Sequence, residues 1–527
     1  MASGAEPRRR PTTRPLDAAA LARLPRRVPP WAWAVIGVTL LGGALRFATL
    51  GHQSLWLDEA WTAYLVRLHP GEMLAAIPQT ESTPPLYYLL VWAITQVLGH
   101  GDASVRLLSA VAGTVTIPIA YATGAAFATR RVGLVAAALA ATSPILVWYS
   151  QEARSYALVV ALSALTLLCF ARARERPSGW RLAAWAAAAM AALGTHYFAG
   201  FVVVPEAALL LVAALRGRAD SGVVARTLGA LVAVGALGCA LLAMAVGQER
   251  RRSAAWIHHI ALAHRLLETP RDWIAGFPPN VGPWLPWTAG AIAAAALVLL
   301  VRRGEPRERR GAALVGGIGL VALAPPLALA AAGLDYFLAR NVLPAWLPLA
   351  LVLAAGLGAR RAARAGTLLT VALCGLSLTA VVAVAHTPSL QRTSWRALAT
   401  RLGPPRPGRA IVLRRYAYAL PLAVYRPRTW HMEPRSALLR EIDVVTLDTR
   451  GATACWWGAT CGIAGSRPLR RTLVPGFALA GRERAGDFTI SRFVAARPLR
   501  VRRAQLMVRR GNTVLLDGVR SPVPPAG

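Results

Sequence analysis

The sequence contains no lysine, so all 59 of its basic residues are arginines, and it has only 24 acidic residues. The 527-residue chain therefore carries a formal net charge of +35, a surplus that often indicates nucleic-acid binding. Here the arginines gather in short segments between long apolar runs, which is the pattern that the positive-inside rule predicts for membrane proteins. Hydrophobic residues make up 55% of the chain. The composition indicates a protein of the lipid bilayer and argues against a nucleic-acid-binding protein.

Cysteine is also scarce, with five residues in the whole chain. Cys169, Cys239 and Cys374 lie in apolar runs, where a thiol behaves as a small buried hydrophobe. Cys455 and Cys461 lie six residues apart in a polar region near the C-terminus. If that region is extracytoplasmic, the pair is a candidate disulfide, and two unlinked thiols are the alternative. The sequence leaves both alternatives open.

Apolar runs of about 17–25 residues recur from Trp31 to His386, and a bilayer-spanning helix needs this length. The first run is not a cleaved signal peptide, because it is too long, lacks a clear small-residue cleavage site and is followed by further runs. We expect an all-α polytopic membrane domain with about eleven transmembrane helices. Their expected positions are 31–50, 106–127, 132–149, 155–171, 181–196, 198–215, 226–247, 285–301, 311–332, 341–358 and 366–386.

Five arginine-rich loops decide the orientation of these helices. The loops lie at 129–131, 172–181, 216–226, 302–310 and 360–364. Each is separated from the next by two apolar runs, so all five lie on one side, which the positive-inside rule identifies as the cytoplasm. The segment 84–98 has only about 15 residues, and counting it as a span would place all these loops outside. We expect it to be an interfacial or re-entrant helix within a first outer loop at 51–105.

Three further segments flank the membrane domain of residues 31–386. Residues 1–30 contain arginine runs and prolines, and they are expected to form a disordered cytoplasmic arm. Residues 387–518 are expected to form a small extracytoplasmic α/β domain, because a helical pattern at 395–402 and two strand-like segments are separated by Pro and Gly. The strand-like segments are 410–413 and 443–447. Residues 519–527 are rich in proline and are expected to be a disordered tail.

Unusual polar residues collect on the predicted outer face. Asp58 and Glu59 follow the first span almost at once. Carboxylates next to a membrane helix are costly to desolvate, which makes this pair a hypothesis for a functional site. The other polar and aromatic residues of this face are Tyr88, Arg106, Tyr149, Gln151, Glu152, Arg154, Tyr156, His196, Tyr197, His258, Tyr336 and Arg340.

These residues also have purely structural interpretations. Asp58 would cap a helix, and Glu152 with Arg154 would stabilise a tight turn. His196 would be a hydrogen-bonded interface residue, and Arg340 would extend to the lipid headgroups. The functional interpretation is favoured because acids, arginines and tyrosines converge on one membrane face.

At these residues a resemblance to a known family becomes visible. The acidic pair and four later segments, in this order, resemble the GT-C glycosyltransferases. The segments are TPPLYY (Thr83–Tyr88), VRLLSAVAG (Val105–Gly113), SPILVWYSQEARSY (Ser143–Tyr156) and DYFLAR (Asp335–Arg340). The branch is that of the protein O-mannosyltransferases and bacterial aminoarabinose transferases, and the resemblance covers residues 31–386. Many relatives have a histidine before the Pro-Pro pair, whereas this chain has Ser82 and Thr83 there.

The resemblance implies transfer of a sugar, with inversion, from a polyprenyl-phosphate donor to a glycan, lipid or protein acceptor. The reaction would take place on the outer face of a bacterial cytoplasmic membrane. Asp58 matches the position of the family's catalytic acid, and a carboxylate suits the general base that an acceptor hydroxyl needs. The leaving lipid phosphate gains negative charge, which suits arginine forks. Arg154, Arg340 and Arg106 are the candidates for the donor phosphate.

Glu59 is expected to orient the acceptor, to hold an arginine or to touch a metal. The residues expected to position the substrates are Tyr88, Tyr149, Gln151, Glu152, Tyr156, His196, Tyr197 and Tyr336. No cofactor is required by the pattern, but some relatives bind a divalent metal near the acidic pair, and Glu59 and His258 are the candidate ligands here. The alternative function is a transporter or flippase of lipid-linked sugars, which would use the same arginines without a base. Transporters often contain internal repeats with broken helices, and the sequence shows no such repeat.

Overall fold

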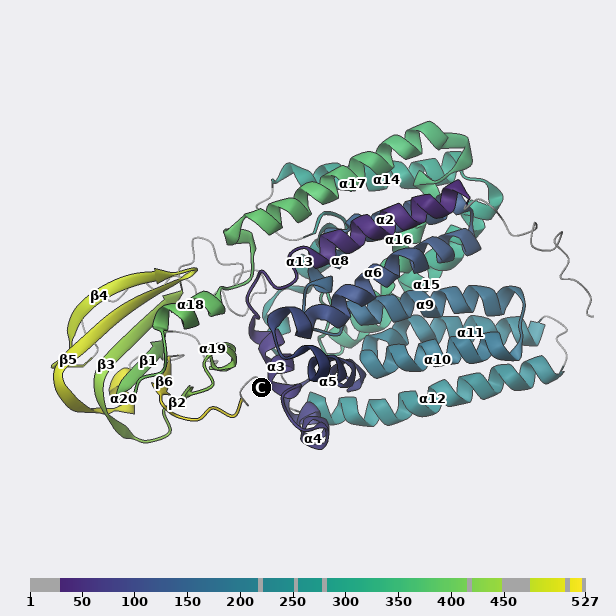
Figure 1. Ribbon diagram of the computed structural model, residues 1–527. Coiled ribbons are helices and arrows are strands. Elements are labelled where there is room, and N and C mark those ends of the chain that lie inside the picture. Colours follow the sequence, from purple (N-terminus) through teal and green to yellow (C-terminus); the bar gives the residue numbers. More distant parts are fainter. Residues whose placement is uncertain are drawn as a thin grey trace, which may run out of the picture.

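The computed structural model describes residues 29–216, 221–250, 255–276, 282–414, 419–447, 474–507 and 512–523. A mostly helical part and a six-stranded sheet near the C-terminus lie at opposite ends of an elongated molecule (Figure 1). The expected fold class, a polytopic helical protein with a small C-terminal α/β part, is therefore confirmed. Most of the predicted N-terminal arm, both Cys455 and Cys461, and the end of the tail lie outside the described residues.

Helices occupy all the segments that the apolar runs predicted as spans. They are α2 (Pro30–Phe47), α6 (Asp102–Phe127), α7 (Arg130–Thr142) with α8 (Pro144–Ser150), α9 (Tyr156–Glu175), α10 (Gly179–Thr195), α11 (Gly200–Arg216), α12 (Ser221–Glu249), α14 (Trp284–Arg303), α15 (Pro306–Ala331), α16 (Trp346–Leu357) and α17 (Ala363–His386). Within the described residues, eight helices are long and apolar enough to cross a membrane, or nine if α7 and α8 are one bent span. The total of eleven spans stays a prediction.

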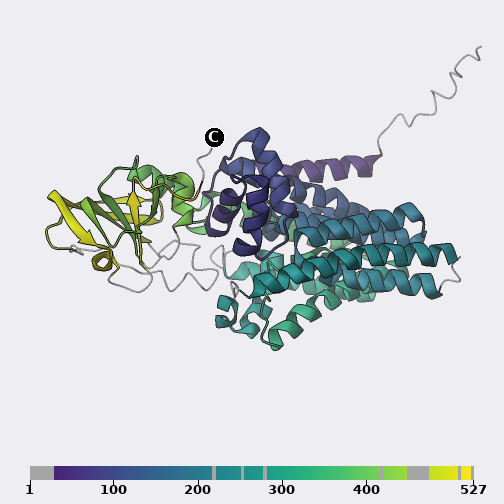
Figure 2. The ribbon, with the colours of Figure 1, turned by 90° about the horizontal axis from the view of Figure 1, so that it is seen from below.

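The first outer loop contains three short helices, α3 (Leu57–Leu65), α4 (Pro70–Thr80) and α5 (Leu86–Leu98). The 13 residues of α5 extend over about 20 Å at 1.5 Å per residue, which is too short for the roughly 30 Å hydrocarbon core. This length agrees with the interfacial or re-entrant position expected for 84–98. Two views show α3 and α4 on the side of the helical part that faces the sheet (Figures 1 and 2).

The span expected at 132–149 is broken into α7 and α8, which meet at an angle of 56°. The break lies at Pro144, whose nitrogen has no hydrogen to donate to the carbonyl of Ala140. Arg46 of α2 replaces the missing donor, since its Nη2 donates to Ala140 O at 2.8 Å and its Nη1 to Ala141 O at 3.0 Å. Arg46 also donates to Ser150 Oγ at 3.1 Å. A buried arginine within the helices thus stabilises the bend that brings residues 151–155 toward the first outer loop.

The sheet is built from six strands in the order β2-β6-β1-β3-β5-β4. The strands are β1 (Arg409–Leu413), β2 (Thr429–His431), β3 (Ser436–Leu447), β4 (Ala478–Ala485), β5 (Phe488–Arg502) and β6 (Thr513–Asp517). β1 and β3 are parallel and the other described pairs are antiparallel. Three helices accompany the strands, α18 (Trp395–Leu402), α19 (Leu420–Tyr425) and α20 (Arg503–Leu506). The predicted helix at 395–402 and the strands at 410–413 and 443–447 lie within α18, β1 and β3.

The residues after α17 dock onto the first outer loop. The backbone N–H of Leu55 donates to the hydroxyl of Tyr425 at 2.8 Å, and that hydroxyl donates to Asp102 at 2.6 Å. Arg396 forms an ion pair with the same Asp102 carboxylate. The backbone N–H of Arg392 donates to Gln53 Oε1 at 2.9 Å. The sheet region is thereby fixed against the loop that carries the acidic pair.

The first residues of the predicted tail are packed against the sheet region. Ser521 N–H donates to Pro427 O at 3.0 Å, and the side chain of Val523 is buried against the first outer loop and α19. Residues 519–523 therefore differ from the disordered segment that their composition suggested. A single buried apolar side chain in a proline-rich segment was too weak a signal to predict this contact.

Candidate active site

Asp58 and Glu59 lie in the first turn of α3 and have very different surroundings. Glu59 is completely buried, whereas a quarter of the Asp58 side chain is exposed. Neighbouring residues on a helix point about 100° apart, which separates the two carboxylates. Glu59 accepts a hydrogen bond from the backbone N–H of Trp56 at 3.3 Å, so it also caps α3. Negative charge is favourable at a helix N-terminus because of the helix dipole.

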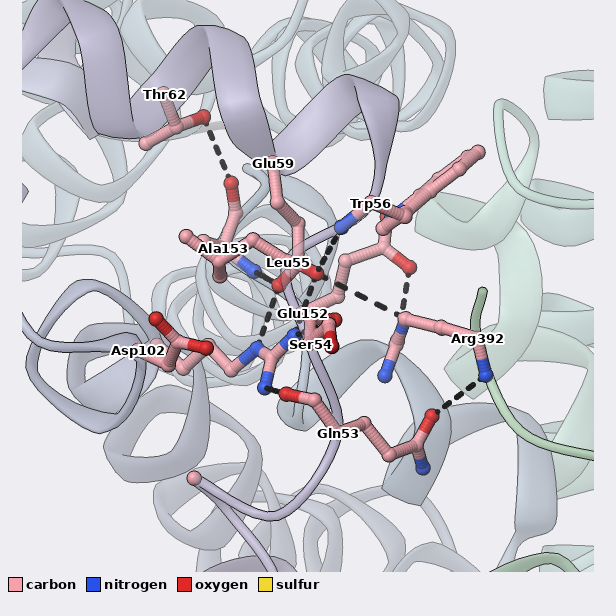
Figure 3. Close-up of polar contacts among 12 residues, drawn as sticks. Gln53, Ser54, Leu55, Trp56, Glu59, Thr62, Asp102, Glu152, Ala153 and Arg392 are labelled. Atoms are coloured by element: carbon pink, nitrogen blue, oxygen red, sulfur yellow. Dashed lines mark hydrogen bonds and ion pairs between the residues drawn. The ribbon is translucent and has the colours of Figure 1, made fainter. Parts of the chain in front are cut away.

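Glu59 holds Arg106 in a two-pronged ion pair. Arg106 Nε donates to Glu59 Oε1 and Nη2 donates to Oε2, both at 2.6 Å. The backbone N–H of Ala153 donates to Glu59 Oε1 at 2.7 Å (Figure 3). Of the three roles expected for Glu59, holding an arginine is the one that these contacts display.

Arg106 is fully engaged by the protein. Besides its bonds to Glu59, it donates to the carbonyls of Leu50, Gln53 and Ser54. These contacts use all five N–H groups of the guanidinium, which leaves none for a phosphate. The geometry therefore gives Arg106 the task of shaping the first outer loop, in place of the phosphate-binding role expected from the sequence.

Asp58 faces a second arginine, Arg340, from the segment that follows α15. Arg340 Nη1 lies 3.4 Å from Asp58 Oδ2, which is a long contact for an ion pair. The guanidinium of Arg340 lies 6.0 Å from the ring centre of Tyr156 and 5.8 Å from that of Trp256. The Tyr156 ring is 4.8 Å from Tyr149 between ring centres. Four separate parts of the chain therefore meet around the Asp58 carboxylate.

Arg154 lies on another side of Asp58 and is shared with Glu81. Arg154 Nη1 donates to Glu81 Oε2 at 2.7 Å and lies 3.4 Å from the backbone carbonyl of Asp58. Glu81 also accepts from the hydroxyl of Tyr88 at 2.7 Å, and that hydroxyl lies 3.0 Å from Thr83 Oγ1. The Nε–H of Arg154 is buried and has no hydrogen-bond partner among the described residues. The Nε–H of Arg154 is thus a donor that a ligand beside Asp58 could use.

His196 lies beside this cluster at the end of α10. Its ring centre is 6.0 Å from that of Tyr156, and its surroundings include the charges of Arg154 and Arg340. Its Nδ1 accepts the backbone N–H of Phe198 at 3.2 Å. A neutral ring with an accepting Nδ1 carries its hydrogen on Nε2. His196 can therefore offer an N–H donor without adding a third positive charge.

The segment that carries Arg340 is anchored by α13 (Leu262–Ala275), which sequence reasoning did not single out. Arg265 binds both oxygens of Asp335, at 2.7 and 2.5 Å, and donates to the carbonyl of Phe337 at 2.7 Å. Trp273 Nε1 donates to the carbonyl of Ala339 at 3.0 Å. These bonds hold the backbone on both sides of the turn that presents Arg340.

Arg392 is a second residue that sequence reasoning missed. Its Nη2 donates to Glu152 Oε2 at 3.0 Å, and its guanidinium lies 4.1 Å from the ring centre of Trp148. Its Nε lies 3.9 Å from Glu59 Oε2 (Figure 3). One signal was available: Arg392 is a lone arginine just after the last apolar run, on the side where the positive-inside rule gives arginine no topological role.

Glu152 lies in the turn between α8 and α9 and is completely buried. Burial raises the pKa of its carboxyl to about 7, against the opposing effect of the positive charge of Arg392. The negative charges of Glu59 and Asp58 also raise this pKa. Its Oε1 has no hydrogen-bond partner among the described residues. Burial thus makes Glu152 a weaker acid than an exposed glutamate.

The other candidates lie away from the Asp58 carboxylate. Gln151 donates to the carbonyls of Leu45 and Arg46 and so closes the end of α2. Tyr197 donates to Gln248 Oε1 at 2.8 Å. Among the described residues, Tyr336 is linked to this group through its ring contact with Phe198, at 6.3 Å between centres.

The candidate metal ligands do not come together. His258 is exposed at the end of a short 3-10 helix, Ala255–His259, while Glu59 is buried and bound by Arg106. In the part of the chain that the structure describes, no three His, Cys, Asp or Glu side chains gather to hold a metal ion. The residues present do not form a metal site around Glu59.

A family comparison bears on this arrangement. Residues 82–242 match the model of a family described as dolichyl-phosphate-mannose-protein mannosyltransferase. The resemblance to GT-C glycosyltransferases is confirmed. The matched range includes TPPLYY and the SQEARSY turn with Glu152 and Arg154, whereas Asp58 and Arg340 lie outside it. A search of curated proteins gives no match.

Several solved structures are similar to this chain. ArnT from Cupriavidus metallidurans in the apo state has 14% sequence identity and a TM-score of 0.39, with 90% of this chain and 98% of that chain covered. The Archaeoglobus fulgidus oligosaccharyltransferase in complex with Zn and sulfate has 14% identity and a TM-score of 0.44, with 70% and 55% covered. The S. cerevisiae protein O-mannosyltransferase Pmt1-Pmt2 complex has 18% identity and a TM-score of 0.34, with 42% and 34% covered. The chain thus spans about half of the archaeal protein and a third of the yeast one.

Proposed function

We propose that this GT-C-like membrane protein transfers a sugar from a polyprenyl-phosphate donor to an acceptor on the outer face of a bacterial cytoplasmic membrane. The observation that carries the proposal is the partly exposed carboxylate of Asp58 opposite Arg340. The neighbouring acid Glu59 is buried and bound by Arg106, while Asp58 lies 3.4 Å from Arg340 and a quarter of its side chain is exposed. The proposal takes Asp58 as the base and Arg340 as the cation beside it.

Asp58 is the proposed general base. The acceptor hydroxyl must lose a proton as its oxygen attacks the anomeric carbon, and a carboxylate within hydrogen-bond reach accepts that proton. Attack occurs on the face opposite the phosphate, so the anomeric configuration inverts. The bond between the anomeric carbon and the phosphate oxygen breaks, and its electron pair leaves with the lipid phosphate.

Arg340 and Arg154 are the proposed ligands of the donor phosphate. Negative charge grows on the phosphate as the glycosidic bond breaks, and fixed guanidinium groups stabilise it with no reorganisation. The buried Nε–H of Arg154, which has no hydrogen-bond partner among the described residues, supports this role. The Nε2–H of His196 offers a further neutral donor to a phosphate or sugar oxygen. Arg106 is not included, because its donors are all engaged.

Glu152 and Arg392 are proposed as positioning residues. Together with Glu59 they form a buried network of acids and arginines directly behind the SQEARSY turn. This network sets the backbone of residues 152–154 and hence the place of Arg154. Arg392 belongs to the connection with the sheet region, so the network needs that region to be docked.

The lipid tail of the donor is proposed to lie in an apolar cavity of about 770 Å³ between α7, α13, α14, α15, α16 and α17. Its walls include Leu139, Trp273, Leu300, Trp346 and Leu373. Trp273 is also hydrogen-bonded to the segment that carries Arg340, which links the cavity to the proposed phosphate site. A long isoprenoid chain matches such an apolar lining.

The proposal is tested by assaying Asp58→Asn with a polyprenyl-phosphate-linked sugar in detergent. We expect the rate of transfer to fall by at least about a hundredfold, because the variant keeps the shape of the side chain but cannot accept the proton. Glu72→Gln is the matched control, since Glu72 is an exposed acid in the first turn of the neighbouring helix α4 and should have no effect.

Full activity of Asp58→Asn would rule out Asp58 as the base. A separate vesicle experiment addresses the transporter alternative. If the wild-type protein moved labelled lipid across vesicles and transferred no sugar, the transferase proposal would be wrong as a whole.

A further inference from the structure

The sheet region carries a large surplus of positive charge. Residues 387–527 contain 25 arginines and only seven acidic residues. This region follows the last span on the predicted outer side, and there the positive-inside rule gives arginine no topological role. The surplus therefore requires an explanation of its own.

Some arginines of the region are consumed by internal ion pairs. Arg409 and Arg426 bind the buried carboxylate of Asp517, at 2.5 and 2.8 Å. Arg492 lies 3.0 Å from Glu441 and 3.2 Å from Asp443. These pairs hold the sheet together and use three of the six acids of this region that the structure describes. Other arginines must face solvent.

The solvent-facing arginines gather at one end of the β3–β5 pair. In the antiparallel register Ser436 lies opposite Arg502, and Leu438 lies opposite Arg500. Residues two apart on a strand point to the same face, so Arg500 and Arg502 share a face with Leu438. Arg440 follows at the β-bulge that shifts the register between Leu439 and Glu441. All three arginines are exposed.

More exposed arginines border this face. They are Arg435, Arg497 and Arg503. The backbone N–H of Arg503 donates to the carbonyl of Arg435 at 2.8 Å, which brings the ends of the two strands together. In the described ranges, none of these six arginines forms an ion pair with Asp or Glu; Arg500 contacts Ser436 Oγ and Arg503 the carbonyl of Met432. We define the six residues as the arginine face.

The arginine face is turned away from the membrane part. The opposite end of β5, at the turn before Phe488, contacts the connection to α17 through Asp487 and Ser394, at 3.0 Å. Figure 1 shows α20, which follows Arg502, on the far side of the sheet from the helices. We therefore look for the ligand of this face in the aqueous space and not among the lipid headgroups.

We propose that the arginine face binds an anionic glycan, which serves as acceptor for the proposed transferase. Guanidinium forks match carboxylate and phosphate groups in two-pronged contacts. Single exposed ion pairs are weak, so a chain with repeated negative charges that bridges several arginines is the ligand that this spacing favours. Leu438, 57% exposed among the arginines, offers an apolar contact for the C–H face of a sugar ring. The assignment as acceptor rests on the proposed function, whereas the binding itself does not.

The test measures binding of a fluorescent oligogalacturonate to the full-length protein in detergent at several salt concentrations. We expect saturable binding that weakens as salt rises. The variant R440Q/R500Q/R502Q should bind about tenfold more weakly or worse, and the corresponding triple lysine variant should keep part of the affinity. The matched control R302Q/R303Q/R307Q removes the same charge from exposed positions at the adjoining ends of α14 and α15, away from the sheet, and should bind like wild type. Unchanged thermal unfolding would show that the variants are folded.

Three results would overturn the inference. One is an equal loss of affinity in both glutamine triples, and another is equal binding of a neutral dextran oligomer. The third is tighter binding of a DNA oligonucleotide of equal charge, which would identify a nucleic-acid surface instead. Asp58→Asn should bind the glycan normally, so this assay fails or succeeds independently of transfer. If the protein transferred sugar but did not bind the glycan, only the inference about the arginine face would be wrong. If it bound the glycan but did not transfer sugar, only the proposed function would be wrong.

Discussion

At the residue scale, one helical step separates two carboxylates with different tasks. Glu59 is neutralised by Arg106 and caps α3, while Asp58 keeps a partly exposed carboxylate near Arg340. A buried ion pair that loses one partner leaves an uncompensated charge, which commonly costs about 3–5 kcal/mol of stability. A substitution of Glu59 would therefore change stability and activity together. A substitution of Asp58 tests the effect on the rate of transfer with less effect on stability.

Arg340 should be sensitive to the shape of its cation as well as to its charge. We expect Arg340→Gln to lower the rate of transfer by on the order of 10²–10³, as removal of one preorganised donor does elsewhere. Arg340→Lys should recover only part of this, because an ammonium lacks the planar fork. Steady-state rates with a polyprenyl-phosphate-linked sugar provide the measurement. Arg361→Gln, at an exposed arginine of the 360–364 loop, serves as control. Equal activity of the lysine variant and wild type would contradict a fork-shaped phosphate contact.

The raised pKa of Glu152 predicts a pH dependence of stability. Unfolding returns this carboxyl from a pKa of about 7 to its usual 4.5, so the folded state binds more protons between these values. The contribution of Glu152 to stability is therefore complete below pH 4.5 and is lost as the pH rises through about 7. Thermal unfolding in detergent should show this decline in wild type and a flatter profile in Glu152→Gln. Parallel profiles for the two proteins would show that Glu152 does not titrate in this window.

At the element scale, the short connection between α17 and α18 and the start of α18 form ion pairs with the membrane part. Arg392 in this connection reaches Glu152 and Glu59, and Arg396 in the first turn of α18 reaches Asp102. Arg392 is 3% exposed and Arg396 is 42% exposed, so solvent weakens only the second interaction strongly. The two arginines, four residues apart, form a natural pair for comparison.

Arg392→Gln should destabilise the protein by about 3 kcal/mol, because it leaves buried acids without their cation. Arg396→Gln should change stability by less than about 1 kcal/mol, as for other exposed ion pairs. Loss of Arg392 should also raise the pKa of Glu152 further, since the Arg392 charge lowers it. Unfolding curves and the pH profile of transfer measure both effects. Similar losses in the two variants would indicate that the connection acts only as a tether.

The helices of the membrane part could be predicted from apolar run length, because each run needs only its own residues to be recognised. The contact by which Arg46 replaces the missing donor at Pro144 could not, since it joins residues 94 positions apart. Likewise β1 and part of β3 were visible as apolar strands, whereas β4 is an exposed edge strand with no apolar face. Local sequence patterns were enough to predict the helices and strands, whereas their irregularities depend on contacts between residues far apart in the chain.

At the scale of the whole molecule, the orientation rests on five arginine-rich loops. Single cysteines in a cysteine-free background test it. His100→Cys lies in the first outer loop and should react with an impermeant maleimide added to intact cells. Glu305→Cys lies between α14 and α15 and should react only after the membrane is opened. The reverse pattern would contradict this topology: either α5 is a true span, or the whole membrane part is inverted and the acidic pair lies on the cytoplasmic side.

The residues of the candidate site could be predicted from the sequence, but the ion pairs between them could not. Asp58, Arg154, Arg340, Tyr156 and His196 were all named from the outer loops, and they lie together. The pairing of Arg106 with Glu59 was not predictable, because any arginine on the same face satisfied the sequence pattern equally well. Arg265 and Arg392 were missed for the related reason that their acidic partners are 70 and 240 residues away.

The contact between Leu55 and Tyr425 has a consequence for the order in which the protein is made. The two residues are 370 positions apart, so at 5–20 residues per second the ribosome needs roughly 20–70 s to reach the second after the first. During this interval the helices that follow enter the membrane one after another. The first outer loop with α3 still lacks its contacts with the residues after α17. An unfinished chain can thus be fully inserted and still lack its site, which makes the last part of synthesis the moment at which activity is acquired.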